Sequence, residues 1–325
     1  MPDHVSPKPT TEQAASPRLI SVVVPTRDRP QLLTQALASI RALESDALRF
    51  QILVGDNGRD PATREAAAAF GAEHIPVARD GAGAARNAAM RAARGAFIAF
   101  LDDDDVWTSD HIAGHLGLLD ADPTLDGVFA QVTSVDQDLR PLDTWPAPPG
   151  AGDALVRAML SGYYPQIGAT LVRASVREAI GFFDEALLGD QDWDWQLRLA
   201  RRRRVAFHAA PAVLFRQRPP GSYDALRLRR LGFGRRVFLR HALPELRLWR
   251  SPAAFADAYY RVLGQYYFYF RDAAIERAAR GEAGVWRAVW GAARTFPLRT
   301  ARDLMLGGAM RAALFAGRAR GGAAS

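Results

Sequence analysis

The sequence predicts an α/β fold in which helices flank a mixed, mainly parallel sheet, followed by a helical C-terminal region. Two observations lead to this prediction. In the first two thirds of the 325-residue chain, short continuous apolar runs alternate with segments of helical periodicity. That pattern is typical of strands buried on both faces and joined by helical crossovers. Beyond about residue 222 the apolar periodicity is helical only.

Three apolar runs are the predicted strands. They are LISVVVP at 19–25, FQILVGD at 50–56 and FIAFLD at 97–102. Helical patterns occupy the intervals at 30–43, 61–70 and 82–93. Because parallel strands end at the same edge of a sheet, we expect a ligand site at their carboxyl ends.

Polar residues follow the first two strands. Thr26, Arg27 and Asp28 end the first, and Asp56 ends the second. Each group also has a structural explanation, because Asp-Asn-Gly is a common turn and Thr26 or Asp28 would suit the N-cap of the next helix. Taken singly, these two segments favour the structural explanation.

The third strand ends in four consecutive aspartates. Like charges about 4 Å apart repel by roughly 1 kcal/mol even in water, so something must offset their crowding. A hard divalent cation prefers such oxygen ligands. In an extended chain Asp102 and Asp104 point to one side and Asp103 and Asp105 to the other, so an Asp-x-Asp pair would serve a metal-bound ligand. The structural alternative is that Asp105 caps a helix beginning near Trp107.

The composition excludes several classes of protein. Cysteine is absent, which excludes disulfides and thiolate metal sites. No stretch approaches the roughly 18 apolar residues of a membrane-spanning helix. Residues 1–18 lack the apolar core of a signal peptide and are interpreted as a disordered leader. We therefore expect a cytoplasmic protein.

The net charge of +7 is distributed unevenly along the chain. Residues 1–215 carry 21 Lys and Arg against 28 Asp and Glu, whereas residues 216–325 carry 21 against 7, so the two parts have net charges of −7 and +14. The basic part also contains two aromatic stretches at helical spacing, FADAYYRVLGQYYFYF and GVWRAVWGAARTF. Such stripes are most often core or subunit interface, which would make a homodimer. The functional alternative is an interfacial helix on anionic lipid, peripheral at the inner face of a membrane.

Four segments resemble the family 2 glycosyltransferases, which are inverting enzymes with the Rossmann-like GT-A fold. SVVVPTRDRPQLL, ILVGDNG, GAGAARNAAMRAARGAFIAFLDDDDVW and GFFDEALLGDQDWDWQLRLA occur in the family's order and spacing. With the composition, the resemblance divides the chain into a leader at 1–18, a GT-A domain at 19–222 and a basic, aromatic-rich helical region at 223–325.

The resemblance implies a nucleotide-sugar site at the strand ends. Family members hold the nucleobase with the end of the first strand and the aspartate of the second. The implied donor contacts in this sequence are Pro25, Thr26, Arg27, Asp56, Arg86, Asp102 and Asp103. In the Asp-x-Asp motif, Asp102 would approach the ribose and Asp104 would hold Mn²⁺ or Mg²⁺ on the diphosphate. Asp105 and Trp107 are further candidate contacts with the diphosphate or the acceptor.

The later motif normally reads Glu-Asp followed by an aromatic residue, and its aspartate is the catalytic base. GDQDWDW places Gln191 at the glutamate position, Asp192 at the base position and Trp193 after it. Asp190 and Asp192 would equally suit a helix N-terminus, where a negative charge is worth about 0.3 to 1 kcal/mol. Gln191 and Trp193 are counted as possible diphosphate or acceptor contacts.

One departure from the family concerns a possible metal contact. Arg218 stands where many relatives carry a histidine, so a third metal ligand there is in doubt. Arg216 or Arg218 would instead contact the diphosphate, because guanidinium suits phosphate oxygens. The structural alternative is a solvated turn.

The resemblance implies a metal-dependent, inverting hexosyltransferase-type enzyme. Its donor would be a nucleoside-diphosphate sugar, with UDP or dTDP favoured because Asp56 can accept the N3 proton of uracil or thymine. Its acceptor would be a carbohydrate or a lipid-linked glycan of the cell envelope. The alternatives are an inactive nucleotide-binding regulatory protein and a nucleotidyltransferase, although PTRDRP lacks the latter's Gly-rich loop with Lys. No nucleic acid partner is expected, since a nucleic acid binder would leave the acidic crevice without a role.

Overall fold

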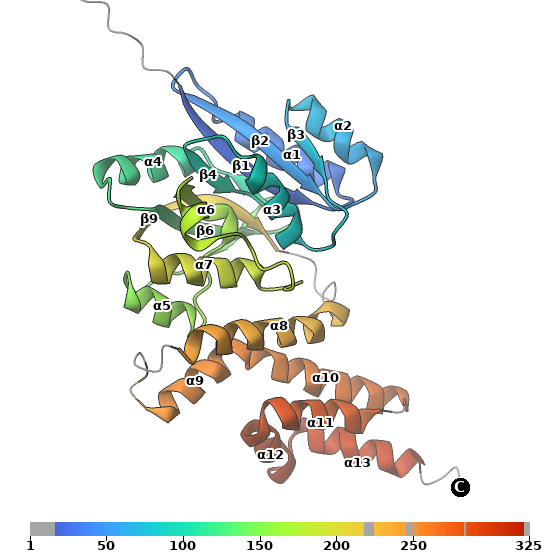
Figure 1. Cartoon of the computed structure of the whole chain (residues 1–325). Coiled ribbons are helices and arrows are strands. Elements are labelled where there is room, and N and C mark those ends of the chain that lie inside the picture. Colours follow the sequence, from blue (N-terminus) through green and yellow to red (C-terminus); the bar gives the residue numbers. More distant parts are fainter. Residues whose placement is uncertain (1–16, 218–223, 245–248, 250, 283, 322–325) are drawn as a thin grey trace, which may run out of the picture.

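The computed structural model describes residues 17–217, 224–244, 249, 251–282 and 284–321. Figure 1 shows a twisted sheet flanked by helices and, below it in that view, a stack of helices that ends with the C-terminus. The fold class predicted from the sequence is confirmed. The predicted leader up to residue 16, the boundary at 222 and Arg218 lie outside the described residues.

The described strands form one nine-stranded sheet in the order β3-β2-β1-β4-β8-β6-β9-β5, with β7 paired to β6. Their bounds are β1 (Arg18–Thr26), β2 (Leu48–Asp56), β3 (Glu73–Pro76), β4 (Phe97–Phe100), β5 (Val106–Trp107), β6 (Gly127–Val135), β7 (Pro141–Thr144), β8 (Thr170–Arg173) and β9 (Val205–Arg216). Strands β3, β2, β1 and β4 are parallel. Beyond β4 the sheet is mixed, because β8 is antiparallel to both β4 and β6 while β9 is parallel to β6. The carboxyl ends of β1, β2, β4, β6 and β9 therefore lie at one edge.

Helices cover this sheet and continue beyond it. Those of the sheet region are α1 (Pro30–Arg41), α2 (Pro61–Ala69), α3 (Ala82–Ala92), α4 (His111–Ala121), α5 (Asp153–Met159), α6 (Val176–Ile180) and α7 (Gln191–Arg202), with a 3₁₀ turn η1 (Ile167–Ala169). The C-terminal helices are α8 (Asp224–Ala242), α9 (Pro252–Leu263), α10 (Gln265–Arg280), α11 (Val285–Thr295), α12 (Pro297–Met305) and α13 (Ala309–Gly321). In the described part of the chain, no helix is both long and apolar enough to cross a membrane.

The predicted strands and helices of the N-terminal half form close to the predicted residues because their apolar patterns are strong. The last seven residues of β1 and of β2 are all buried, as expected for central parallel strands. Helix α1 starts at Pro30, whose fixed φ suits a first helical position. It buries Leu33, Leu37 and Ile40 against the sheet, at the spacing of one helix face.

Three capping predictions are wrong. Trp107 belongs to strand β5, and the next helix begins at His111, so Asp105 caps no helix. Neither Thr26 nor Asp28 caps α1, whose N-cap is Arg29 with no side-chain hydrogen bond. The Asp28 carboxylate instead accepts hydrogen bonds from the backbone N–H groups of Arg59 and Asp60. These side chains have long-range partners, which local sequence patterns do not reveal.

The C-terminal helices share a hydrophobic core with the sheet region. One cluster of buried side chains includes Phe100 of β4, Trp195 of α7, Phe238 of α8 and Val262 of α9. The first aromatic stripe is mainly core, as the structural explanation predicted: Val262 and Tyr266 are buried, and Phe255, Tyr259 and Phe270 are half-buried against the cluster.

Candidate active site

A cleft of about 460 Å³ opens at the edge where the parallel strands end. Its walls come from the ends of β1 and β4, the start of α3, the loop before η1, the start of α7 and helix α8. The lining residues include Pro25, Thr26, Arg27, Arg29, Asn57, Arg86, Asp102, Asp103, Asp104, Trp145, Tyr164, Gln166, Asp190, Gln191, Asp192, Trp193 and Arg230. The sequence-predicted ends of the first and third strands and the later motif thus meet in one place.

Two of the four aspartates point into the protein, where side chains and backbone N–H groups offset their charge. Asp103 is fully buried and accepts hydrogen bonds from the Thr26 hydroxyl at 2.6 Å and from Nε of Arg29 at 3.1 Å. Asp105, 1% exposed, accepts from Nε2 of Gln166 at 2.7 Å and from the backbone N–H of Arg216 at 2.9 Å. Burial raises the pKa of Asp103 to about 7 and that of Asp105 well above its usual range, and the neighbouring aspartates add to both effects.

The other two aspartates face the cleft. The Asp102 and Asp104 side chains are 26% and 13% exposed. Arg86 donates from Nη2 to Asp102 at 2.5 Å, and Arg29 donates from Nη1 to Asp104 at 2.7 Å. Desolvation nevertheless raises the pKa of Asp102, since the attraction of Arg86 does not fully offset it. The alternation predicted from the extended chain is therefore present for these four side chains, except that Asp105 also leans toward the cleft-facing pair.

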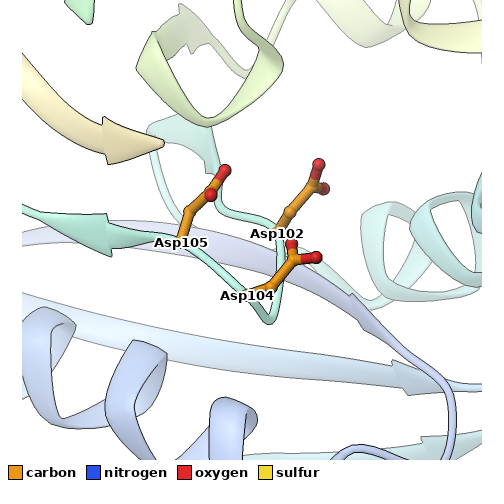
Figure 2. Close-up of side chains that lie close together, drawn as sticks. All are labelled: Asp102, Asp104 and Asp105. Carbon is orange, nitrogen blue, oxygen red and sulfur yellow. The ribbon is translucent and has the colours of Figure 1, made fainter. Parts of the chain in front are cut away.

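The arrangement fits a hard divalent cation. Asp102, Asp104 and Asp105 each offer one carboxylate oxygen, and these three atoms lie within 4.8 Å of one another. Figure 2 shows the three side chains close together on the loop after β4. An oxygen-only donor set of this size suits Mg²⁺ or Mn²⁺. Both oxygens of Asp105 already accept hydrogen bonds, so Asp102 and Asp104 are the better placed ligands.

Helix α7 brings the later motif to the cleft. Asp192 lies in its first turn and lines the cleft, with Oδ1 accepting from the backbone N–H of Trp193 at 2.9 Å. The charge of Asp192 contributes to the raised pKa of Asp102, so the two carboxylates lie within electrostatic range of each other. Gln191 and Trp193 are largely buried beside it, and both also line the cleft.

Asp190 precedes α7 and differs from Asp192. Its backbone is left-handed, with φ at 57°, and its side chain makes no capping hydrogen bond. Its carboxylate lies 3.4 Å from Nη2 of Arg230 on α8. Burial raises the pKa of Asp190 to about 6, and Asp192 adds to the effect while Arg230 opposes it. Asp190 is the N-cap residue of α7, and Asp192 lies in the first turn, so the predicted helix N-terminus is confirmed although the Asp190 side chain makes no capping hydrogen bond.

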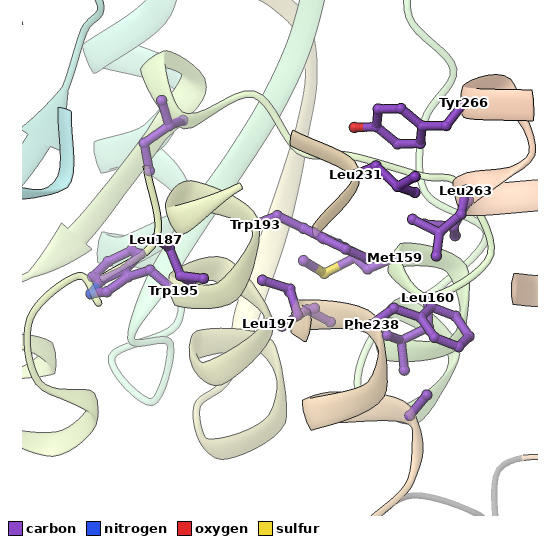
Figure 3. Close-up of a cluster of buried hydrophobic side chains, with 14 of the residues drawn as sticks. Met159, Leu160, Leu187, Trp193, Trp195, Leu197, Leu231, Phe238, Leu263 and Tyr266 are labelled. Atoms are coloured by element: carbon purple, nitrogen blue, oxygen red, sulfur yellow. The ribbon is translucent and has the colours of Figure 1, made fainter. Parts of the chain in front are cut away.

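A buried ion-pair network fixes α7 to α8. The Asp194 carboxylate, 1% exposed, accepts from Arg198 at 3.0 Å, Arg240 at 2.8 Å and His241 at 3.0 Å. Burial alone would raise the pKa of Asp194, but these donors lower it to about 2. Figure 3 shows the apolar side of the same contact, where Trp193 and Leu197 of α7 lie near Leu231 and Phe238 of α8. The turn that carries Asp192 is thus held from the C-terminal region.

Only some of the residues predicted to hold the nucleobase line the cleft. Pro25, Thr26 and Arg27 line it, and the Arg27 side chain is 59% exposed. Asp56 is 6% exposed and does not line the cleft. One of its oxygens accepts from the backbone N–H of Gly58 at 2.7 Å, and the other lies 2.9 Å from Nε2 of His74.

Like Asp56 and Asp105, the predicted contacts Trp107 and Arg216 do not line the cleft. Trp107 is buried in the core, where its indole N–H donates to the carbonyl of Gly168 and its ring stacks on His111. The Arg216 guanidinium is buried and donates to the backbone carbonyl of Asp104 at 2.9 Å and to Gln35 at 2.7 Å. These contacts make Arg216 a support for the aspartate loop.

Sequence reasoning missed several residues that line the cleft, among them Arg29, Trp145 and Arg230. Arg29 had a detectable signal, because it directly precedes the helix that follows the first strand end and so lies near the aspartates. Arg230 and Trp145 had none, since both are far in sequence from the motifs and are brought to the cleft by the packing of α8 and by the segment after β7.

The chain is similar to known proteins in sequence and in fold. Residues 21–178 match the family model described as Glycosyl transferase family 2. The chain is 30% identical over 216 residues to the uncharacterized protein y4gI of Sinorhizobium fredii, covering 64% of this chain and 23% of that protein. It is 30% identical over 171 residues to the uncharacterized glycosyltransferase alr2836 of Nostoc, covering 45% and 53%. The matched regions span less than two thirds of these two relatives.

A relative with a stated reaction is also similar. Over 105 residues the chain is 28% identical to the UDP-Glc:alpha-D-GlcNAc-diphosphoundecaprenol beta-1,3-glucosyltransferase WfgD of Escherichia coli, covering 31% of this chain and 41% of WfgD.

Two solved structures share the fold over most of their length. The Staphylococcus aureus protein TarS, residues 1–349, matches with a TM-score of 0.58 at 15% identity, covering 92% of this chain and 88% of that one. The mannosyltransferase PcManGT of Pyrobaculum calidifontis, in complex with GDP-Man and Mn²⁺, matches with a TM-score of 0.50 at 21% identity, covering 98% and 90%.

Proposed function

Because this chain belongs to glycosyl transferase family 2, we propose that it moves a sugar from a nucleoside-diphosphate sugar to an acceptor hydroxyl in one inverting, metal-dependent step. The observation that carries the proposal is the position of Asp192. This carboxylate lines the same cleft as Asp102 and Asp104, although about 90 residues separate them in sequence.

Asp192 is the proposed general base. It would accept the proton of the acceptor hydroxyl as that oxygen attacks the anomeric carbon, while the bond from this carbon to the diphosphate oxygen breaks on the opposite side. A single displacement inverts the anomeric configuration and leaves a nucleoside diphosphate. Asp194, which contacts Arg198, Arg240 and His241 behind the cleft, orients the helix that carries the base.

Asp104 and Asp102 are the proposed metal ligands. A bound Mn²⁺ or Mg²⁺ would stabilise the charge that develops on the leaving diphosphate. Arg29 and Arg86 hold the two carboxylates toward the cleft, at 2.7 and 2.5 Å. The presence of Mn²⁺ in the complex of the Pyrobaculum mannosyltransferase supports a metal-dependent reaction.

A uracil or thymine nucleotide is the proposed donor class. Asp56 ends β2 beside the first strand end; a rotation of its buried carboxylate away from Gly58 and His74, toward the cleft, would let it accept the N3 proton of these bases. TarS has been solved in complex with UDP, and WfgD is named for UDP-Glc, which supports this choice. The GDP-Man complex of the mannosyltransferase favours guanine instead. Competition among UDP, dTDP, GDP and ADP for the cleft decides between them, and tightest binding of GDP would contradict the proposal.

A cell-envelope glycan, carbohydrate or lipid-linked, is the proposed acceptor. WfgD is named for an acceptor carried on diphosphoundecaprenol, which supports a lipid-linked substrate.

The test of the function is a screen of sugar nucleotides with Mn²⁺, followed by one substitution. Asp192→Asn keeps the side-chain shape but removes the basicity, so transfer should fall by about 10² to 10⁴-fold. Nucleoside diphosphate affinity should stay near that of the parent chain, because binding needs no proton acceptor there. Asp190→Asn, two residues earlier, is the matched control.

Two outcomes would contradict this assignment. If Asp192→Asn transfers sugar at the parent rate while Asp190→Asn is inactive, the base lies at Asp190. If the parent chain binds nucleotide sugars but shows neither transfer nor metal-dependent hydrolysis with any donor, the chain is a nucleotide-binding protein without this activity.

A further inference from the structure

Exposed apolar side chains are concentrated in the last four helices. Among the described residues, eight of the eleven large hydrophobic side chains that stand exposed lie between residues 265 and 315. They are Phe268, Ile275, Trp286, Trp290, Leu298, Met305, Leu306 and Phe315. An accumulation of this kind on one end of a protein marks an interaction surface.

Helices α11 and α12 are both amphipathic, and their outer faces are unusual in composition. On α11, Trp286 and Trp290 are one turn apart and each 60% exposed, while Val285 and Val289 on the adjoining face are buried. On α12, Leu298 and Met305 are two turns apart and 74% and 72% exposed. These side chains therefore stand in solvent, although α11 packs into the core through Val285, Val289 and Ala292. Helix α12 buries only Thr300.

The charges around these side chains are almost all positive. Residues 285–315 contain five arginines, which are Arg287, Arg294, Arg299, Arg302 and Arg311, against one carboxylate, Asp303. Asp303 accepts a hydrogen bond from the backbone N–H of Met310 at 2.9 Å. Within the part of the chain that the structure describes, none of the five arginines forms an ion pair with a carboxylate. Arg294 and Arg302 stand exposed on the same helices as the two tryptophans and the two aliphatic side chains.

A cavity of about 310 Å³ lies between α10 and α12, next to the exposed side chains of α12. Arg271, Arg299 and Arg302 line it together with Asp303, Phe268 and Leu306. The Arg299 guanidinium carbon lies 4.6 Å from the ring centroid of Phe268, so its position is fixed by stacking. Arg271 is paired with Asp272 at 2.8 Å. The cavity combines net positive charge with an apolar rim, as a phosphate-bearing headgroup with an attached acyl chain would require.

We propose that the outer face of α11 and α12, defined by Trp286, Trp290, Arg294, Leu298, Arg302 and Met305, is a docking surface for an anionic lipid bilayer. Tryptophan favours the headgroup level of a membrane because its ring is amphipathic. Leu298 and Met305 would enter the acyl boundary while the arginines meet lipid phosphates. A protein partner of ordinary surface composition would not match a face on which exposed Arg294 and Arg302 stand among exposed tryptophan and aliphatic side chains. The surface is separate from the catalytic cleft, so the proposal does not depend on the proposed reaction.

Co-sedimentation of the full chain with vesicles tests the proposal. We expect binding to vesicles of phosphatidylcholine with phosphatidylglycerol at low salt, and weak binding to pure phosphatidylcholine. Arg294→Gln with Arg302→Gln should lower the partition coefficient about tenfold or more, since each basic residue near an anionic surface adds about 1 kcal/mol before screening. The charge-matched control is Arg64→Gln with Arg157→Gln, two exposed arginines on α2 and α5, which should bind like the parent.

A second pair of variants tests the apolar contribution. Trp286→Gln with Trp290→Gln should weaken binding at both low and high salt, whereas Leu142→Gln, on β7 and also 60% exposed, should not. The proposal is overturned if the parent chain stays in the supernatant with anionic vesicles at low salt, or if the two arginine pairs behave alike. Loss of self-association in the tryptophan variant, without any lipid binding by the parent, would identify a second copy of this chain as the occupant.

Discussion

At the scale of single residues, the run of four aspartates is stable because each carboxylate has a cationic or N–H partner, with Arg29 shared between Asp103 and Asp104. Arg29 pairs with Asp103, which also accepts a hydrogen bond from the Thr26 hydroxyl, and Asp105 accepts from Gln166 and from the backbone N–H of Arg216. The run therefore consists of two structural carboxylates interleaved with two that face the cleft. Substitutions of the cleft-facing Asp102 and Asp104 should consequently have different effects from substitutions of the inward-pointing Asp103 and Asp105.

We expect Asp104→Asn to weaken Mn²⁺-assisted binding of a nucleoside diphosphate by about tenfold or more, because it removes a proposed metal ligand. The free energy of unfolding should change little, since this side chain points to the cleft. Asp103→Asn should instead leave nucleotide binding nearly unchanged and lower the free energy of unfolding by about 1 to 3 kcal/mol, because it disturbs a buried acceptor of Thr26 and Arg29. Calorimetric titration with and without chelator, beside urea unfolding, separates the two. Equal nucleotide affinity of Asp104→Asn and the parent in both conditions would exclude the metal role.

At the scale of elements, α4 carries two histidines that are buried in neutral form. His111 stacks on Trp107 of β5, and His115 lies near His208 of β9. Burial is the main cause that lowers the pKa of His115 to about 4 and that of His111 well below its usual range. His208 contributes to both shifts, and backbone carbonyls oppose them.

These histidines give folding stability a pH dependence with a definite sign. Unfolded histidine binds its proton with a pKa near 6.5, whereas folded His115 does so only near 4. Stability from this source is fully present above pH 6.5 and is lost as the pH falls toward 4, by at most about 3 kcal/mol for His115. His115→Gln should flatten the slope of unfolding free energy against pH between 6.5 and 4, measured by urea unfolding. An unchanged slope would mean that another group causes the acid sensitivity.

At the scale of the whole molecule, prediction from sequence succeeded where apolar runs are long. Strands β1 and β2 were predicted from their long apolar runs. In the structure each of them contains seven consecutive buried residues. Strand β5 has two residues, and β9 mixes buried and exposed positions, so neither leaves a readable pattern. The Asp-x-Asp and Asp192 motifs were identified because they are local. Two of the arginines that pair with aspartates of these motifs were not identified from the sequence. Arg29 pairs with Asp103 across 74 residues and Arg230 with Asp190 across 40, and only the folded chain brings these residues together.

The hydrophobic core continues across the predicted domain boundary near residue 222. Residues from both sides of it belong to one hydrophobic cluster, in which Trp193 and Leu197 of α7 pack with Leu231 and Phe238 of α8. The Asp194 network crosses the same contact. Helix α8 therefore supports the helix that carries the proposed base, and we expect the described chain to unfold as one cooperative unit.

Phe238→Ala tests this cooperativity. Phe238 is fully buried and packs against Trp249, Phe255 and Tyr259, so its truncation should cost about 3 to 5 kcal/mol. In urea, tryptophan fluorescence and the loss of nucleoside diphosphate binding should report the same midpoint, lowered equally in the variant, because coincident transitions are the mark of two-state unfolding. Leu243→Ala, 50% exposed just beyond α8, is the control and should change stability by less than about 0.5 kcal/mol. If Phe238→Ala shifts the fluorescence transition but leaves the binding transition in place, the C-terminal helices are an independent domain and cannot be what holds Asp192 in position.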